Sequence, residues 1–199
     1  MKNFASSRLQ ALFEQYGSSD YIGEPLSIVA HSLQAAHHAN AHLVKESEDG
    51  VMRSEEEKNA IVIAALLHDV GHIMAMEAEV VPETAEGQRG EGQGAPDQEG
   101  GGGRQEPIFR SMDGCGVVGH EFIAADFLLS LGLPARVANL VRFHVPAKRY
   151  LCGRDPGYYG NLSEASKTTL GFQGGPMTEE ECTVFEQDVD FKNALLVST

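Results

Sequence analysis

The strongest constraint on the fold is an apolar run that ends in a His-Asp pair. Residues 60–67 read Ala-Ile-Val-Ile-Ala-Ala-Leu-Leu and lead directly into His68 and Asp69. A segment without a polar face belongs in a protein core, so the pair is expected near the interior. A buried imidazole and carboxylate need polar partners, and a metal ion can satisfy both. The two oxygens of Asp69 could bridge two metal ions, although a core His hydrogen-bonded to its neighbouring Asp is the plainer interpretation.

Length and charge narrow the class of protein. The chain has 199 residues, with 29 Asp or Glu against 15 Lys or Arg and a formal charge of −14. A chain of this size is expected to form one domain with a full core. The acidic balance argues against nucleic acid and against an anionic membrane surface as partners.

The cellular compartment is predicted from the cysteines and from the apolar segments. Three cysteines form no Cys-x-x-Cys pair, which indicates a reducing compartment. No stretch is long and apolar enough to span a membrane, and residues 1–8 lack the apolar region of a signal peptide. We therefore expect a cytoplasmic protein.

Helical spacing recurs along the chain, and no long strand pattern is present. The fold is therefore predicted to be all-α. Ser54 with Glu57 and Thr178 with Glu181 fit capping boxes. Pro146 is expected to close its helix within about a turn, which would leave residues 148–159 as a loop. The predicted helices span residues 6–16, 26–45, 54–69, 122–131, 134–146, 164–170, 179–186 and 191–197.

One segment differs in composition from the rest. Eight of the 22 glycines fall between positions 87 and 103, mixed with Glu, Gln, Pro and Asp. Such a segment has little apolar surface to bury. We predict a single domain over residues 1–199 that is interrupted by a disordered Gly/Glu-rich insertion at about 77–110.

Four histidines lie on or at the ends of separate apolar helices. A helical bundle can direct side chains from several helices to one central point. Four imidazoles and one bridging carboxylate suit two ions such as Fe, Mn or Zn, and ligand type alone does not choose among them. The candidate set is His31, His68, Asp69, His120 and His144. His37, His38 and His42 share a helix with His31 and are expected to be solvated.

The order of these residues resembles the HD-domain superfamily of metal-dependent enzymes. The finer resemblance is to HD-domain diiron oxygenases of the PhnZ/TmpB type, which cleave 1-hydroxyphosphonates. It covers nearly the whole chain except the insertion. The most specific matching segments are His144-Val-Pro-Ala-Lys148 and Gln173-Gly-Gly-Pro176, together with Tyr21-x-x-Glu24, His68-Asp69-x-x-His72 and Gly119-His120-Glu121.

The resemblance implies a helical HD-domain bundle with a mixed-valent Fe(II)/Fe(III) pair at its centre and O2 as co-substrate. His31 and His68 would bind one iron, His120 and His144 the other, and Asp69 would bridge them. A small organophosphonate would be the partner, and its phosphonate would be held by His72, Lys148, Ser166 and Gln173. A dianionic group does prefer a cation with several neutral donors.

Tyr21 and Glu24 would lie at the amino end of the substrate, with catalytic roles for both and for His72. The implied reaction is C–P cleavage of a 2-amino- or 2-(trimethyl)amino-1-hydroxyethylphosphonate, with phosphate and glycine or glycine betaine as products. The resemblance also includes a further Asp ligand, whose position falls beyond Thr199.

Plainer interpretations and other functions stay open. Lys148 could be solvated, Ser166 and Gln173 ordinary loop residues, and His72 a helix cap. Tyr21 and Glu24 could be turn and cap residues. The alternative functions are an HD-domain phosphohydrolase that uses metal-activated water and a truncated, catalytically impaired form that still binds a phosphonate.

Overall fold

The computed structural model describes residues 2–21, 25–79 and 109–198, and within these it is a bundle of ten helices. Only two isolated β-bridges occur in these residues. The predicted all-α class is therefore confirmed. The helices are α1 (Lys2–Tyr16), α2 (Ile28–Glu48), α3 (Glu55–Leu67), α4 (Val70–Glu79), α5 (His120–Ser130), α6 (Ala135–Arg154), α7 (Pro156–Asn161), α8 (Glu164–Phe172), α9 (Glu179–Phe185) and α10 (Phe191–Val197).

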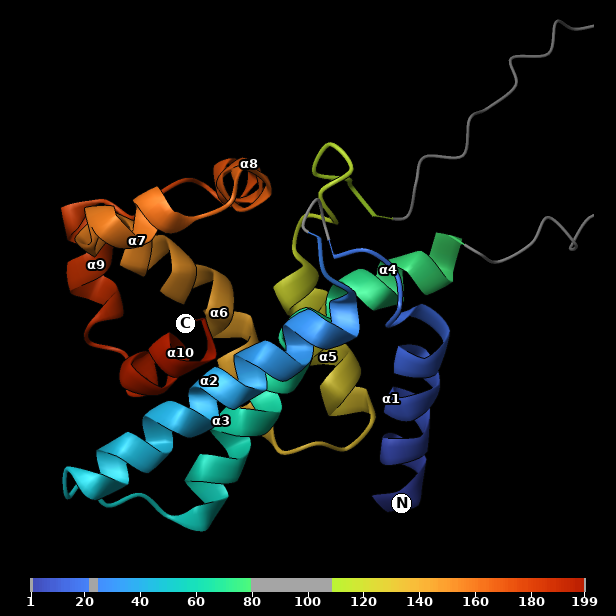
Figure 1. Cartoon of the computed structure of the whole chain (residues 1–199), viewed down its shortest axis with the longest axis horizontal. Helices are drawn as coiled ribbons and strands as arrows, with labels where there is room; N and C mark the ends of the chain where they lie inside the picture. Colours follow the sequence, from blue (N-terminus) through green and yellow to red (C-terminus); the bar gives the residue numbers. More distant parts are fainter. Residues whose placement is uncertain (1, 22–24, 80–108, 199) are drawn as a thin grey trace, which may run out of the picture.

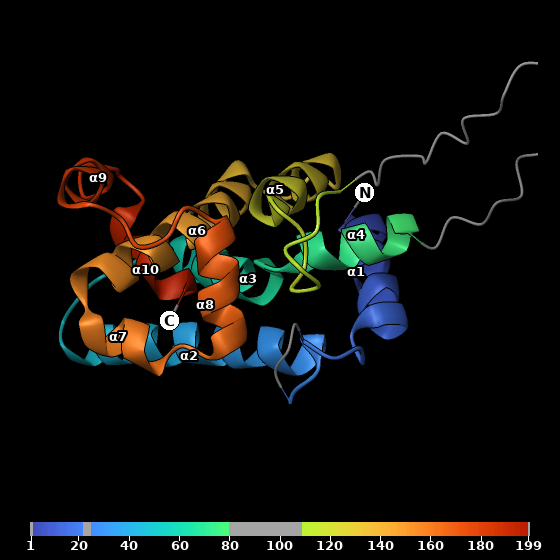
Figure 2. The same ribbon diagram turned by 90° about the horizontal axis from the view of Figure 1, so that it is seen from above.

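Helix α3 lies at the centre of the bundle, with other helices packed around it. In Figure 1, α2 crosses the bundle, with α1 and α4 at one end and α7, α9 and α10 at the other. Figure 2 shows the same separation of the two ends from above. Helix α3 packs against α2, α6 and α10, and α4 packs against α5. The apolar run of α3 is consequently the centre of the main core, with Ala60, Ile61, Ala64 and Ala65 all buried.

The His-Asp pair lies where this central helix is interrupted. Helix α3 ends at Leu67, and α4 begins at Val70 with its axis bent by 41° relative to α3. His68 and Asp69 occupy the junction, and the Asp69 carbonyl accepts a hydrogen bond from the His72 N–H at 2.9 Å. The apolar run thus carries the pair into the core, and the pair is buried where the helix axis bends. No single helix of the described residues has the length and apolar character to cross a membrane, although the bent pair α3–α4 meets both conditions together.

Several predicted boundaries are confirmed. The Ser54 hydroxyl accepts from the Glu57 N–H, and Thr178 with Glu181 forms a complete capping box. Helices α8, α9 and α10 agree with their predictions to within two residues. His37, His38 and His42 are exposed, as expected.

The predicted helices differ from the structure at several places. Helix α1 begins at Lys2 instead of residue 6, and α3 ends at Leu67 and is followed by α4, which was not predicted. Pro146 does not close its helix, because α6 continues to Arg154, and residues 156–161 form α7 instead of a loop. A proline removes one backbone hydrogen bond, and the burial of Ala147 and Cys152 beyond it compensates for that loss. The insertion predicted at about 77–110 stays a prediction, although α4 runs through Glu79 at its start. Its remainder at 80–108 lies outside the described residues.

Gly71 sets how closely α4 approaches α5. A Cβ atom at this position would lie 2.1 Å from the backbone oxygen of His120. Only glycine leaves enough room, because that oxygen belongs to a helix backbone that cannot rotate away. Gly71 lies within α4 and is therefore a point of close approach between α4 and α5.

We expect Gly71→Ala to lower the free energy of unfolding by about 1–3 kcal/mol, because overpacking would force α5 to shift. Urea unfolding of the metal-free protein measures this change. The matched control is Gly160→Ala in α7, where an added Cβ meets nothing within 4 Å. Equal stability of the two variants would contradict the close approach.

Candidate metal centre

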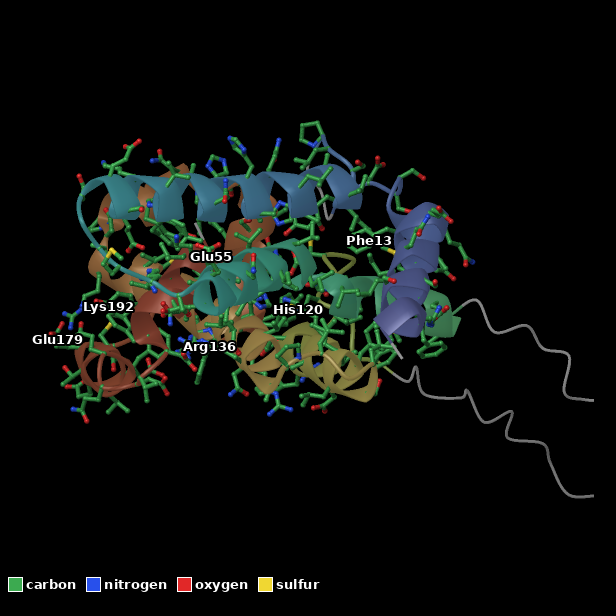
Figure 3. The ribbon with its side chains drawn as sticks, turned by 90° about the horizontal axis from the view of Figure 1, so that it is seen from below. Phe13, Glu55, His120, Arg136, Glu179 and Lys192 are labelled. Atoms are coloured by element: carbon green, nitrogen blue, oxygen red, sulfur yellow. The ribbon has the colours of Figure 1, made fainter. Side chains whose placement is uncertain are left out.

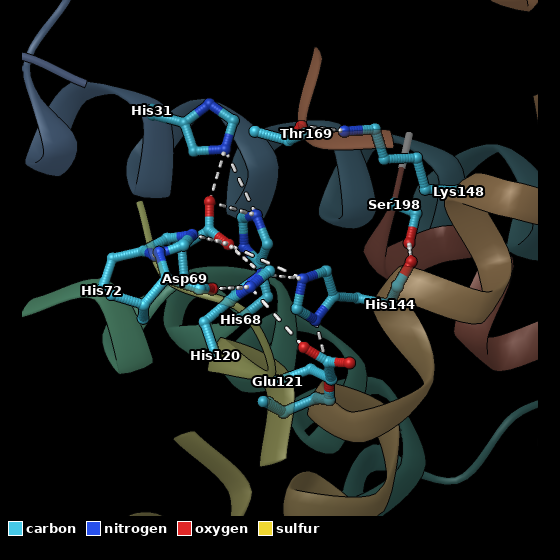
Figure 4. Close-up of polar contacts among 12 residues, drawn as sticks. His31, His68, Asp69, His72, His120, Glu121, His144, Lys148, Thr169 and Ser198 are labelled. Carbon is cyan, nitrogen blue, oxygen red and sulfur yellow. Dashed lines mark hydrogen bonds and ion pairs between the residues drawn. The ribbon is translucent and has the colours of Figure 1, made fainter. Parts of the chain in front are cut away.

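Three helices and one junction bring the five predicted metal ligands together. His31 lies on α2, His120 opens α5 and His144 lies within α6, while His68 and Asp69 occupy the α3–α4 junction. His31 is half-buried and the other four are buried. Figure 3 shows His120 in the interior of the bundle, and Figure 4 shows the imidazoles gathered around Asp69.

The two oxygens of Asp69 face different histidine pairs. Oδ2 lies 3.4 Å from His31 Nε2 and 3.1 Å from His68 Nε2. Oδ1 lies 3.3 Å from His120 Nε2 and 3.6 Å from His144 Nε2. The described residues thus contain two groups that could each hold a metal ion, and both groups share Asp69. We call them the His31/His68 half-site and the His120/His144 half-site.

A histidine binds a metal ion through a nitrogen that carries no proton, so the position of the ring proton shows whether these histidines can act as ligands. The Nδ1 atoms of His68 and His144 lie 2.8 and 2.6 Å from the carbonyl oxygens of Ala65 and Val141. His120 Nδ1 lies 3.3 Å from the carbonyl of Val117. A carbonyl only accepts, so each Nδ1 carries the proton and each Nε2 presents a lone pair to the centre.

Facing lone pairs require a cation. The Nε2 atoms of His120 and His144 are 2.9 Å apart, and those of His31 and His68 are 3.2 Å apart. Two ligand atoms bound at right angles to one ion, each at about 2.1 Å, lie roughly 3 Å apart. The spacing and the donor chemistry therefore fit one ion in each half-site, with the carboxylate between the two ions.

The electrostatics keep Asp69 ionised and His144 neutral. Burial opposes ionisation of Asp69, but attraction to the neighbouring imidazoles, above all to a protonated His68, holds its pKa well below its ordinary value. Burial also opposes ionisation of His68, but the charge of Asp69 raises its pKa, so a metal ion would have to displace that proton. Burial and repulsion from His120 and His68 hold the pKa of His144 well below its ordinary value. A carboxylate and neutral imidazoles are the forms that bind a metal.

His72 differs from the four candidate ligands. Its Nδ1 accepts the backbone N–H of Val117 at 3.2 Å, so a neutral His72 carries its proton on Nε2. Burial lowers the pKa of His72 to about 3, and the charge of His120 adds to this effect. Its ring stacks on that of His120 with centroids 4.0 Å apart. His72 therefore presents a hydrogen-bond donor to the centre.

A cavity of about 210 Å³ opens onto the metal-ligating atoms. It is lined by all five candidate ligands and by Tyr21, His72, Lys148, Ser166 and Gln173. The Tyr21 hydroxyl donates to Asp69 Oδ2 at 2.8 Å, and its ring stacks on His31 with centroids 3.8 Å apart. Lys148 donates to the Thr169 hydroxyl at 3.1 Å. Ten of the eleven predicted site residues thus share one cavity, and Glu24 lies outside the described residues.

Helical register explains why these residues meet. Lys148 is one turn after His144 on α6, and it reaches the cavity because the helix continues past Pro146. Ser166, Thr169 and Gln173 are spaced by three and four residues on and just after α8. Thr169 was missed by the sequence analysis, although this spacing could have identified it. Gln173 Oε1 is buried without a hydrogen-bond partner among the described residues, which leaves an acceptor in this wall of the cavity.

Two further residues that line the cavity were not predicted from the sequence. Tyr158 and Ser198 line the cavity from α7 and from the end of α10. The Tyr158 hydroxyl donates to the Ser198 carbonyl at 2.9 Å, and the Ser198 hydroxyl donates to the His144 carbonyl at 2.8 Å. Burial raises the pKa of Tyr158 to about 12. No local pattern joins residues so far apart in sequence.

The family of the chain follows from comparison with known proteins. The HD domain matches residues 28–189, and the chain belongs to the HD-domain family. It is 30% identical to the [1-hydroxy-2-(trimethylamino)ethyl]phosphonate dioxygenase (glycine-betaine-forming) of Leisingera caerulea, over 94% of this chain and 72% of that protein. It is 31% identical to the hydroxymethylphosphonate dioxygenase of Gimesia maris, over 96% of this chain and 74% of that protein. The predicted resemblance to phosphonate-cleaving HD-domain oxygenases is confirmed.

A further relative is protein L432 of Acanthamoeba polyphaga mimivirus, at 34% identity over 92% of this chain. The chain spans 65% of the length of that protein.

We expect Asp69→Asn to lose both metal ions and His31→Ala to lose one, because only Asp69 belongs to both half-sites. The measurement is iron bound per chain after anaerobic reconstitution and desalting. His38→Ala, an exposed His on the same helix as His31, is the control and should keep both ions. Retention of both ions by Asp69→Asn would contradict a bridging carboxylate.

Proposed function

We propose that this chain is an iron-dependent oxygenase that uses O2 to cleave the C–P bond of a 2-amino- or 2-(trimethyl)amino-1-hydroxyethylphosphonate. With R as the aminomethyl or trimethylaminomethyl group, R–CH(OH)–PO3²⁻ and O2 give R–COO⁻, HPO4²⁻ and H⁺. The carboxylate product is glycine or glycine betaine. Two dioxygenases among the relatives of the chain, each named for a hydroxylated phosphonate, support this class of substrate.

One observation carries the proposal: the two-metal donor set and an anion-binding wall line the same cavity. Lys148 is the one Lys or Arg among the described residues that line it. The hydroxyl of Ser166, the amide of Gln173 and the Nε2–H of His72 add neutral donors, and the Thr169 hydroxyl, which donates to the Ser166 carbonyl, holds the Lys148 ammonium. A phosphonate prefers this combination of one cation with several neutral donors.

The ligand assignments follow the two half-sites. His31 and His68 would bind one iron, His120 and His144 the other, and Asp69 would bridge the pair. Bound there, the iron pair would supply the coordination sites and electrons that O2 requires. Lys148, Ser166 and Gln173 would hold the phosphonate against the His120/His144 half-site. Binding in this position would place the carbinol carbon beside the metal pair.

Tyr21 and Glu24 would face the amino end of the substrate. An aromatic ring suits a quaternary ammonium, and a carboxylate suits either kind of ammonium. Tyr21 stacks on His31 beside the His31/His68 half-site, and its hydroxyl donates to Asp69 Oδ2. Entry of substrate would displace this contact. The role of Glu24 stays a prediction from the sequence.

The test is turnover by iron-loaded protein, followed by O2 consumption and phosphate release. We expect one phosphate released for each O2 consumed, and no phosphate under anaerobic conditions. Release of phosphate without O2, from a phosphate ester and with Mn²⁺ or Mg²⁺, would instead support a phosphohydrolase. Binding of the phosphonate without turnover would support the impaired form.

We expect Lys148→Met to raise KM for the phosphonate by about tenfold or more, because a charge-assisted hydrogen bond contributes about 1.5–3 kcal/mol. Initial rates of phosphate release over a range of substrate concentrations measure this change. Lys167→Met removes a lysine whose ammonium pairs with Glu164 on α8 and is the matched control. A Lys148→Met enzyme with unchanged KM would exclude Lys148 from phosphonate binding.

A further inference from the structure

Glu121 is a buried carboxylate that the ligand set does not use. Among the described residues, Asp69 and Glu121 are the only buried Asp or Glu side chains. Glu121 is 8% exposed and follows His120 directly in the first turn of α5. Figure 4 shows its carboxylate below the imidazole cluster, on the side opposite Lys148 and Thr169. Burying a carboxylate costs free energy, so a partner is required.

The partner is the outer nitrogen of a metal ligand. Oε2 of Glu121 lies 3.6 Å from His120 Nδ1. That same nitrogen lies 3.3 Å from the Val117 carbonyl, a longer contact than the 2.8 and 2.6 Å by which His68 and His144 meet their carbonyls. His120 is therefore the ligand with the weaker carbonyl contact, and it has a charged acceptor beside the same N–H.

The surroundings hold His120 against this carboxylate. The His72 ring stacks on His120, and Gly71 brings α4 against the backbone of His120. The imidazole thus has one packed face, with its Nε2 directed to Asp69 and its Nδ1 directed outward. The 3.6 Å between Nδ1 and Oε2 is a charge contact that a small movement of the Glu121 side chain would shorten to a hydrogen bond.

We propose that Glu121 is a positioning residue that strengthens the His120/His144 half-site selectively. A carboxylate that accepts from Nδ1–H fixes the tautomer of the imidazole and raises the basicity of Nε2, which tightens metal binding. His31, His68 and His144 have no such partner among the described carboxylates other than Asp69. The two half-sites are therefore unequal, and the half-site beside Glu121 has the greater affinity for positive charge.

A structural explanation must be distinguished from this one. An acidic residue in the first turn also stabilises a helix through its dipole. That role would lower the stability of the metal-free protein, and it would be kept in Glu121→Asp, which retains an acidic residue in the first turn of α5. The proposal instead requires a loss of Co²⁺ affinity that depends on the distance from the carboxylate to Nδ1 and that is confined to the His120/His144 half-site.

The experiment separates the half-sites by disabling each in turn. His31→Ala leaves the His120/His144 half-site, and His144→Ala leaves the other. Co²⁺ titrations measure the Kd of the remaining ion with and without Glu121→Gln, and the Co²⁺ absorption spectrum reports its ligand field. This test needs no substrate or O2, so its failure is independent of the proposed oxygenase function.

We expect Glu121→Gln to raise the Co²⁺ Kd about 10- to 100-fold in the His31→Ala background and by less than about twofold in the His144→Ala background. Glu121→Asp keeps the charge at a longer distance and should give an intermediate Kd. The matched control is Asp126→Asn, an exposed carboxylate on the same helix, which should leave both Kd values unchanged.

Equal losses of affinity in the two backgrounds, or none in either, would overturn the proposal. Thermal unfolding of the metal-free variants accompanies the titrations. If Glu121→Gln fails to fold, the Glu121→Asp titrations decide the question. An unchanged Kd for Glu121→Asp in the His31→Ala background would then contradict a distance-dependent effect.

Discussion

The carboxylate of Asp69 is the interaction on which the rest of the centre depends. Each of its oxygens faces a different histidine pair, and the Tyr21 hydroxyl donates to one of them. A buried carboxylate surrounded only by neutral imidazoles would be costly, and four lone pairs that converge on it would repel one another. Two cations remove both costs. The folded state of this bundle is therefore suited to metal ions, and loss of metal should weaken the core that contains the centre.

The core and the centre have a common origin in one segment. The apolar run of α3 is buried on several sides because α2, α6 and α10 pack around it, and its end delivers His68 and Asp69 to the middle of the bundle. Small residues such as Ala64 and Ala124 allow the surrounding helices to approach closely. Gly71 does the same where α4 meets α5. The close contacts between helices at these small residues therefore determine both how the helices pack and where the metal-ligating side chains lie.

Much of this could be predicted from the sequence because the signals are local. The apolar run predicts a core helix, the Thr178–Glu181 box predicts the start of α9, and histidines at the ends of apolar helices predict a shared centre. The prediction failed at Pro146, where tertiary packing keeps a helix intact across a residue that favours a break. Thr169 was missed although it lies within the predicted helix 164–170, where its three-residue spacing from Ser166 places both residues on one face.

Other parts of the site could not have been predicted from local patterns. Tyr158 and Ser198 lie forty positions apart, and only the packing of α7 beside the end of α10 joins them into one wall. The same holds for Glu121, because adjacent residues on a helix usually point apart and only burial shows that this carboxylate stays near His120. Contacts of this kind form only when the helices pack together, so the spacing of residues in the sequence does not predict them.

The most direct test of the central claim is the electron paramagnetic resonance spectrum of iron-loaded protein, prepared anaerobically and partly oxidised, together with its iron content. A carboxylate shared by two irons predicts two irons per chain and a signal from a spin-coupled Fe(II)/Fe(III) pair. That signal should change when 1-hydroxy-2-aminoethylphosphonate is added. A spectrum of isolated ferric ions, with one iron or none per chain, would contradict the shared centre around Asp69.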